Sequence, residues 1–223
     1  DDGGVAERYV SLLRIGAPAG VIVYPWNYDD RADLVGLTTK LQRLSGDNPY
    51  GGRFLIAADQ EGGRVAAYRF RDMVRIPSAA DIGRQAGVPG RDDASSREEI
   101  DDDAVPTRGA VDAEYVRSLA YVVGRDLVAL GINMNFAPVV DLAGKPDSGI
   151  IGDRSWGADP DAVSRLGKAY IEGMRAAGVI ATAKHFPGHG TTTVDSHGRL
   201  PVVDYSLHDL AARDLRPFAA GVA

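Results

Sequence analysis

The sequence contains no cysteine, which excludes disulfide bonds, thiolate nucleophiles and cysteine-based zinc sites. Basic residues are also few, because 25 Lys and Arg stand against 31 Asp and Glu and give a net charge of −6. A protein with this balance lacks the positive surface that binds nucleic acids, so we expect no nucleic-acid partner. No apolar run approaches the roughly 20 residues of a membrane-spanning helix, so we expect no membrane span either.

Nucleotide-binding signatures are missing as well, since neither G-x-G-x-x-G nor a Walker A sequence follows any predicted strand. Four apolar, partly β-branched runs predict buried strands, at residues 20–24, 54–58, 132–141 and 178–183. Helical patterns alternate with them, at residues 7–15, 34–44, 112–130, 159–177 and 206–218. This alternation predicts an α/β fold of parallel βα units. Polar clusters at the strand ends favour a (β/α)8 barrel of the TIM type over a doubly wound sheet.

The predicted barrel is incomplete, because such a barrel needs eight strands and about 250 residues. We therefore expect residues 1–223 to form a single catalytic barrel domain that lacks the first and last strands. Either the sequence is a fragment of a longer protein, or the remainder lies on a companion chain. Residues 89–111 are crowded with Asp and Glu and predict an acidic, solvated surface insert, with a functional lid as the alternative.

The chemistry is predicted to lie where the strands end. The second strand is followed directly by Asp59 and a glycine-rich turn, and the fourth by Lys184 and His185. Three of the four histidines fall in the window 184–201. A strand that ends in titratable residues on a glycine-rich loop is typical of the catalytic face of a parallel α/β barrel.

Several of these residues also have plain structural interpretations. Pro187 and Gly188 interrupt the spacing of His185 and His189, which argues against a metal site and favours a structural role for His189. Arg154 could be a loop anchor paired with Asp153 or Asp159, and Asp195 with His197 a turn pair. Trp26 and Trp156 suit sugar stacking, but loop aromatics more often pack on a barrel rim, and Asp141 is expected to fix loop backbone.

Four segments together resemble family 3 glycoside hydrolases, in particular the bacterial β-N-acetylglucosaminidase branch. They are Asp-Gln-Glu-Gly-Gly-Arg-Val at 59–65, Asn-Phe-Ala-Pro-Val-Val-Asp at 135–141, Ile-Gly-Asp-Arg-Ser at 151–155, and Lys-His-Phe-Pro-Gly-His-Gly at 184–190 followed by Asp-Ser-His at 195–197. The likeness covers nearly the whole chain except the acidic insert. It implies hydrolysis of terminal non-reducing β-N-acetylglucosamine residues from peptidoglycan-derived glycans, without a metal or other cofactor.

The resemblance also implies catalytic roles. His197 would be the acid/base, since an imidazole with a pKa of about 6.5 can donate and then accept a proton near neutrality, and Asp195 would hold its ring. Retaining enzymes of this type also use an Asp nucleophile at the end of a later strand. We find no candidate for it in this chain, because Asp204, Asp209 and Asp214 all lie in or beside a predicted surface helix.

By the same resemblance, the sugar in the −1 subsite would be bound by Asp59, Arg154, Lys184 and His185. Carboxylates and cationic donors pair well with vicinal hydroxyls. The chain departs from close relatives at Ala67, where a second Arg is common. Either Arg69 reaches the same hydroxyl, or that contact is lost.

Two alternative functions remain open: an N-acetylglucosaminide phosphorylase of the same branch, because a His acid/base does not repel phosphate, and a non-catalytic sugar-binding remnant, because the nucleophile is missing. The chain begins at Asp1 rather than Met. We take this as a processed start that favours the cell envelope, with the cytoplasm as the alternative.

Overall fold

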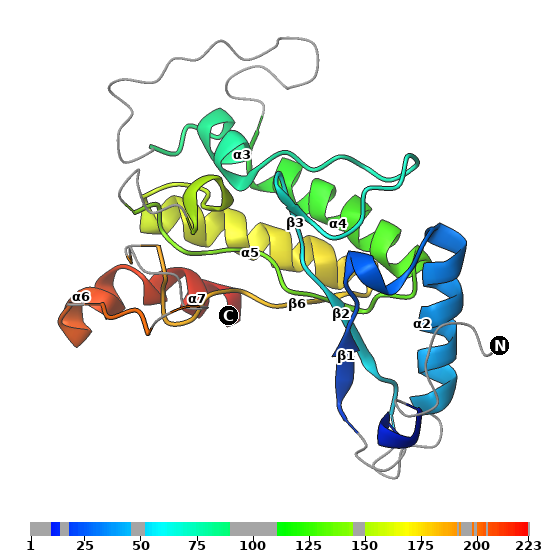
Figure 1. Cartoon of the computed structure of the whole chain (residues 1–223). Coiled ribbons are helices and arrows are strands. Elements are labelled where there is room, and N and C mark those ends of the chain that lie inside the picture. Colours follow the sequence, from blue (N-terminus) through cyan, green and yellow to red (C-terminus); the bar gives the residue numbers. More distant parts are fainter. Residues whose placement is uncertain are drawn as a thin grey trace.

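A computed structural model describes residues 10–13, 18–45, 52–89, 111–144, 150–190, 192, 198, 200–203 and 205–222. Its main sheet has four parallel strands in the order β1 (Gly20–Ile22), β2 (Leu55–Ala58), β5 (Met134–Asn135) and β6 (Ile180–Ala181). All four lie within the runs predicted from the sequence. The sheet does not close, and the fold is part of a (β/α) barrel of the TIM type, as predicted (Figure 1).

Three of the predicted helices are confirmed, whereas the helix predicted over 7–15 lies outside the described residues except for 10–13. The confirmed helices are α2 (Arg31–Ser45), α4 (Ala113–Ala129) and α5 (Pro160–Ala177). The Asp112 side chain caps α4 and the Asp159 side chain caps α5, each by accepting backbone N–H groups of the first turn. Helix α5 ends at Gly178, whose φ of 89° is a left-handed conformation suited to glycine.

The helices cover one side of the sheet and bury its apolar residues. Helices α4 and α5 lie side by side (Figure 1). Helix α2 packs into the same core as β2, and its Gln42 side chain donates to the Phe54 carbonyl at 2.9 Å. Leu34 of α2, Ile56 of β2 and Val163 of α5 are all fully buried in one continuous core. This core holds the carboxyl ends of the strands in place.

Three features differ from the predictions. The sequence between β2 and α4 forms a short hairpin of β3 (Gln60–Gly62) and β4 (Val65–Ala66), followed by α3 (Ala79–Gln85), none of which was predicted. The single helix predicted over 206–218 is two helices, α6 (Leu207–Ala212) and α7 (Leu215–Val222). Short 3-10 turns also occur at η1 (Pro25–Asn27) and η2 (Gly152–Arg154).

The outer strands β1 and β6 each pair on one side only within the part of the chain that the structure describes. Their apolar side chains Ile22 and Ile180 are 43% and 51% exposed. No described helix is long and apolar enough to cross a membrane. Most of the predicted acidic insert, residues 90–110, lies outside the described residues.

Candidate functional site

The parallel ladder brings the predicted sugar-binding residues to one edge of the sheet. Lys184 extends β6, because it forms a parallel bridge with Val139 and its carbonyl accepts the Val140 N–H at 2.9 Å. Asp59 follows β2 directly, and Asn135 in the strand between them hydrogen-bonds the backbone of Gln60 at 3.0 Å in both directions. The ends of β2 and β6 therefore lie on either side of β5, at a spacing that these hydrogen bonds fix.

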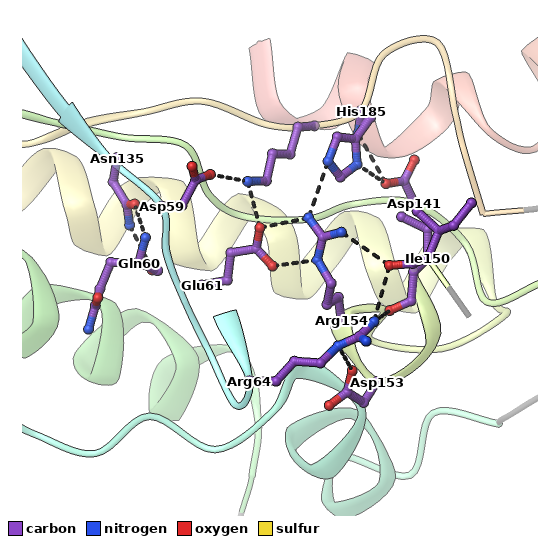
Figure 2. A network of polar contacts seen from close by, with 12 residues as sticks. Asp59, Gln60, Glu61, Arg64, Asn135, Asp141, Ile150, Asp153, Arg154 and His185 are labelled. Carbon is purple, nitrogen blue, oxygen red and sulfur yellow. Dashed lines mark hydrogen bonds and ion pairs between the residues drawn. The ribbon is translucent and has the colours of Figure 1, made fainter. Parts of the chain in front are cut away.

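Two cations and two carboxylates form the centre of the site (Figure 2). The Lys184 ammonium lies 2.6 Å from Asp59 Oδ1 and 2.5 Å from Glu61 Oε1. The Arg154 guanidinium contacts the same Glu61 carboxylate through two parallel bonds, Nε to Oε2 at 2.7 Å and Nη2 to Oε1 at 2.8 Å. Paired bonds of this kind fix the guanidinium in one plane.

The Glu61 side chain is almost buried, with 6% of its area exposed. Burial alone would raise the pKa of this carboxyl, but the hydrogen bonds from Arg154 and Lys184 and the positive charges of both outweigh burial. The pKa is therefore held below its ordinary value of 4.5, and the carboxylate is ionised at neutral pH.

His185 is held in one orientation by partners on both ring nitrogens. Its Nδ1 lies 2.6 Å from Asp141 Oδ2, and its Nε2 lies 3.2 Å from Arg154 Nη2. A guanidinium can only donate, so Nε2 accepts this hydrogen bond and the ring proton sits on Nδ1, where it is donated to Asp141.

Asp141 has the backbone role predicted for it and also orients His185. Its Oδ2 accepts the backbone N–H of His185 at 3.1 Å, and its Oδ1 accepts that of His189 at 2.6 Å. The His189 ring in turn lies against Thr192, with Nδ1 within hydrogen-bond reach of the Thr192 hydroxyl. These contacts fit the structural role predicted for His189. The described residues contain no group of three potential metal-ligating side chains.

Hydrogen-bonding capacity is left over at three atoms of this network. The Asp59 carboxylate uses Oδ1 for Lys184, and the ammonium of Lys184 contacts two oxygens with three N–H bonds. Arg154 makes four contacts with its five N–H bonds, the fourth from Nη1 to the Ile150 carbonyl at 3.2 Å. In the described part of the chain, one acceptor and two donors are thus available to a ligand.

The rim of the site is built by Arg64 and Arg69 of the hairpin region. Arg64 Nε pairs with Asp153 Oδ1 at 2.8 Å, and its Nη2 donates to the Ile150 and Ile151 carbonyls. Arg69 donates to the Gly63 carbonyl at 2.7 Å and the Arg64 carbonyl at 3.2 Å, so it fastens the hairpin.

The interpretation of Arg154 as a loop anchor paired with Asp153 or Asp159 is wrong. Its partner is Glu61, and Asp153 pairs with Arg64 instead. Trp156 is buried and packs edge-on against Tyr170, with ring centroids 6.2 Å apart, so it is not a sugar platform.

The structure brings together Asp59, Arg154, Lys184 and His185, as the sequence predicted. The predicted acid/base pair, Asp195 and His197, lies outside the described residues. Sequence reasoning missed Glu61 at the centre. The available signal was its alternation with Asp59 in a segment that follows a strand.

Comparison with known proteins places the chain in a family. The model for the glycosyl hydrolase family 3 N-terminal domain matches residues 5–223. A β-hexosaminidase A of Pseudoalteromonas piscicida is 35% identical over 213 residues, which are 96% of this chain and 31% of that protein. A β-hexosaminidase of Thiobacillus denitrificans is 40% identical over 200 residues, 89% of this chain and 48% of that protein.

Solved structures of the same kind superpose on the chain. The family 3 β-N-acetylglucosaminidase of Paenibacillus sp. FPU-7 has a TM-score of 0.81 and 32% identity, covering 97% of this chain and 36% of that one. NagZ from Neisseria gonorrhoeae, in complex with N-trifluoroacetyl-D-glucosamine, has a TM-score of 0.79 and 30% identity, covering 98% and 57%. The chain thus spans about a third to somewhat over half of the length of these relatives.

Proposed function

The chain belongs to glycosyl hydrolase family 3, and we propose that it supplies the sugar-binding part of an enzyme that removes terminal non-reducing β-N-acetylglucosamine residues. The observation that carries this proposal is the set of free hydrogen-bonding positions at Asp59, Lys184 and Arg154. An acceptor flanked by two charged donors matches a pair of vicinal sugar hydroxyls, each of which donates one hydrogen bond and accepts others. Glycans derived from peptidoglycan are the proposed source of the substrate.

The proposed reaction retains configuration at the anomeric carbon. His197 donates a proton to the glycosidic oxygen while an Asp nucleophile attacks the anomeric carbon. The same imidazole then takes a proton from the water that releases the sugar. Asp195 would orient the ring. Both residues are assigned from the sequence motif alone.

The nucleophile is proposed to lie in the rest of the protein, which could be contributed by a companion chain. Neither Asp209 nor Asp214 follows a strand: Asp209 lies in the exposed first turn of α6, and Asp214 is buried beside α7. Asp204 is outside the described residues. Assays therefore need the complete protein as well as this chain.

The phosphorylase alternative is less well supported by the charges of the described site. Three carboxylates face two cations there, which leaves an excess negative charge that would repel phosphate; these groups are Asp59, Glu61 and Asp141 against Lys184 and Arg154. If the enzyme released sugar 1-phosphate in phosphate buffer, the reaction would be phosphorolysis and the proposal of hydrolysis would be wrong.

The test is turnover of a chromogenic N-acetylglucosaminide by the complete protein and by this chain alone. We expect His197→Ala to abolish cleavage of substrates with poor leaving groups and to keep part of the activity on activated aryl glycosides, which need no protonation. Equal loss on both would contradict the acid/base role. A complete protein that binds the sugar without turnover would leave only the sugar-binding function.

A further inference from the structure

Glu61 contacts both cations of the site, although the proposed reaction assigns it no step. Its two oxygens contact two different cations, Oε1 both Lys184 and Arg154, and Oε2 Arg154 alone. Figure 2 shows its carboxylate between Asp59 and Arg154. Because the side chain is almost buried, bulk water cannot replace either partner.

The backbone that carries Glu61 is fixed as firmly as its carboxylate. The preceding residue, Gln60, exchanges two hydrogen bonds with the Asn135 side chain. The Gln60 side chain also bonds the backbone of Tyr68 in both directions, at 3.1 Å and 2.9 Å. Glu61 therefore presents its carboxylate from a rigid position, as a fixed anchor must.

Lys184 and Arg154 differ from Glu61 in this respect, because both have long side chains with many rotamers. The other hydrogen bonds of the Arg154 guanidinium go to one carbonyl and to the His185 ring. Among the described residues, the Lys184 ammonium otherwise contacts only the Asp59 carboxylate. Without Glu61, the Arg154 guanidinium would keep only those two contacts, and the Lys184 ammonium only its ion pair with Asp59.

We propose that Glu61 is a positioning residue that holds Lys184 and Arg154 in place for the sugar hydroxyls and does not itself bind the sugar. This inference depends on the proposed function only in taking a sugar as the ligand of Lys184 and Arg154. Its structural content is that one buried carboxylate determines where both donors point, and that Arg154 in turn keeps His185 in its Nδ1–H form.

The substitution that tests this is Glu61→Gln, which keeps the shape and removes the charge. A glutamine can accept from one cation, but its NH2 group would then face the donors of the other. Glu61→Asp keeps the charge and shortens the side chain by one methylene. Asp153→Asn is the matched control, since it removes the partner of Arg64 at the rim and leaves Glu61 intact.

The first measurement needs no sugar. In the complete protein, the Arg154 Nε–H resonance, assigned with Arg154→Lys, should exchange slowly with water in the wild type and in Asp153→Asn. It should broaden or vanish in Glu61→Gln. The 15N shifts of His185 should show the Nδ1–H tautomer in the wild type and a tautomer mixture in Glu61→Gln. Unchanged signals in a Glu61→Gln variant with a native circular dichroism spectrum would overturn the proposal.

The second measurement is the affinity for N-acetylglucosamine by titration calorimetry. Glu61→Gln should bind the sugar about tenfold or more weakly, and Asp153→Asn about as well as the wild type. Equal affinity of Glu61→Gln and the wild type would also overturn the positioning role. A wild type that does not bind the sugar would contradict the proposed function, while the arginine and histidine signals would still decide the role of Glu61.

Discussion

Asp141 and His185 are joined twice: the buried carboxylate accepts both the ring Nδ1–H, at 2.6 Å, and the backbone N–H of the same histidine, at 3.1 Å. A third hydrogen bond, from the His189 backbone, ends on its other oxygen. One side chain thus fixes the ring of His185 together with the turn that carries it.

Replacing Asp141 should therefore damage both stability and the site. We expect Asp141→Ala to lower the free energy of unfolding by about 3 kcal/mol, because it leaves two backbone N–H groups and one ring N–H without their acceptor. Urea denaturation measures this. A loss below about 1 kcal/mol would mean that water replaces the carboxylate.

Glu61 should make stability depend on pH in the acid range. Its pKa is lower in the folded protein than its ordinary value of 4.5, so its contribution is present above pH 4.5 and is lost as the pH falls through the depressed folded pKa. The free energy of unfolding, measured with urea from pH 7 to pH 3, should be higher for the wild type than for Glu61→Gln. This difference should shrink only in this acid window. A difference independent of pH would contradict the charge pairing.

Asp214 should behave in the opposite way. Burial raises the pKa of this carboxyl, the charge of Asp141 adds to the rise, and Arg213 offsets it in part. Within the part of the chain that the structure describes, neither carboxylate oxygen has a hydrogen-bond partner. Burial penalises the protonated form less than the ionised form, so the group destabilises the fold further as the pH rises through its folded pKa.

We expect Asp214→Asn to stabilise the protein by about 1 kcal/mol at pH 7 and to have a smaller effect at pH 3. Thermal unfolding at the two pH values is the measurement. Destabilisation at pH 7 would indicate that the carboxylate is paired in solution.

Two helical glycines should respond to alanine with opposite signs. A Cβ on Gly83 of α3 would lie 1.8 Å from the Trp156 carbonyl oxygen, whereas a Cβ on Gly36 of α2 would meet nothing within 4 Å. Both substitutions gain the same helix propensity, so they form a matched pair. Gly36→Ala should stabilise the protein by about 0.5–1 kcal/mol, and Gly83→Ala should destabilise it by about 2 kcal/mol or more. Equal shifts in urea midpoint would contradict the close approach of α3 to Trp156.

Much of the fold could be predicted because its signals are local. Buried strands appear as short apolar runs. Asp112 and Asp159 mark the first residues of two helices, and Gly178 marks the end of one. The sequence analysis did not predict the hairpin or α3. The hairpin has only a short backbone ladder, and the Gln60 side chain instead bonds the backbone N–H and carbonyl of Tyr68. The cap at Ser78, whose hydroxyl accepts the Asp81 N–H, was a readable signal for α3.

The site was predictable as a set of residues and not as a network of contacts. Asp59 and Lys184 could be located because each follows a strand, and parallel strands end at one edge. The pairing of Arg154 with Glu61 joins residues 93 positions apart. No local pattern selects that partner over neighbouring Asp153, since the choice depends on how the hairpin and η2 pack in three dimensions.

The hydrogen bonds of Gln60 also limit how this segment can change in evolution. Asp59 and Glu61 both reach Lys184, while Gln60 between them points to the backbone of Tyr68. A deletion or insertion of one residue here would reverse which side chains face inward, burying an acid against Tyr68 and turning an amide toward the cations. Length variation among relatives should therefore begin only after the glycine pair at 62 and 63.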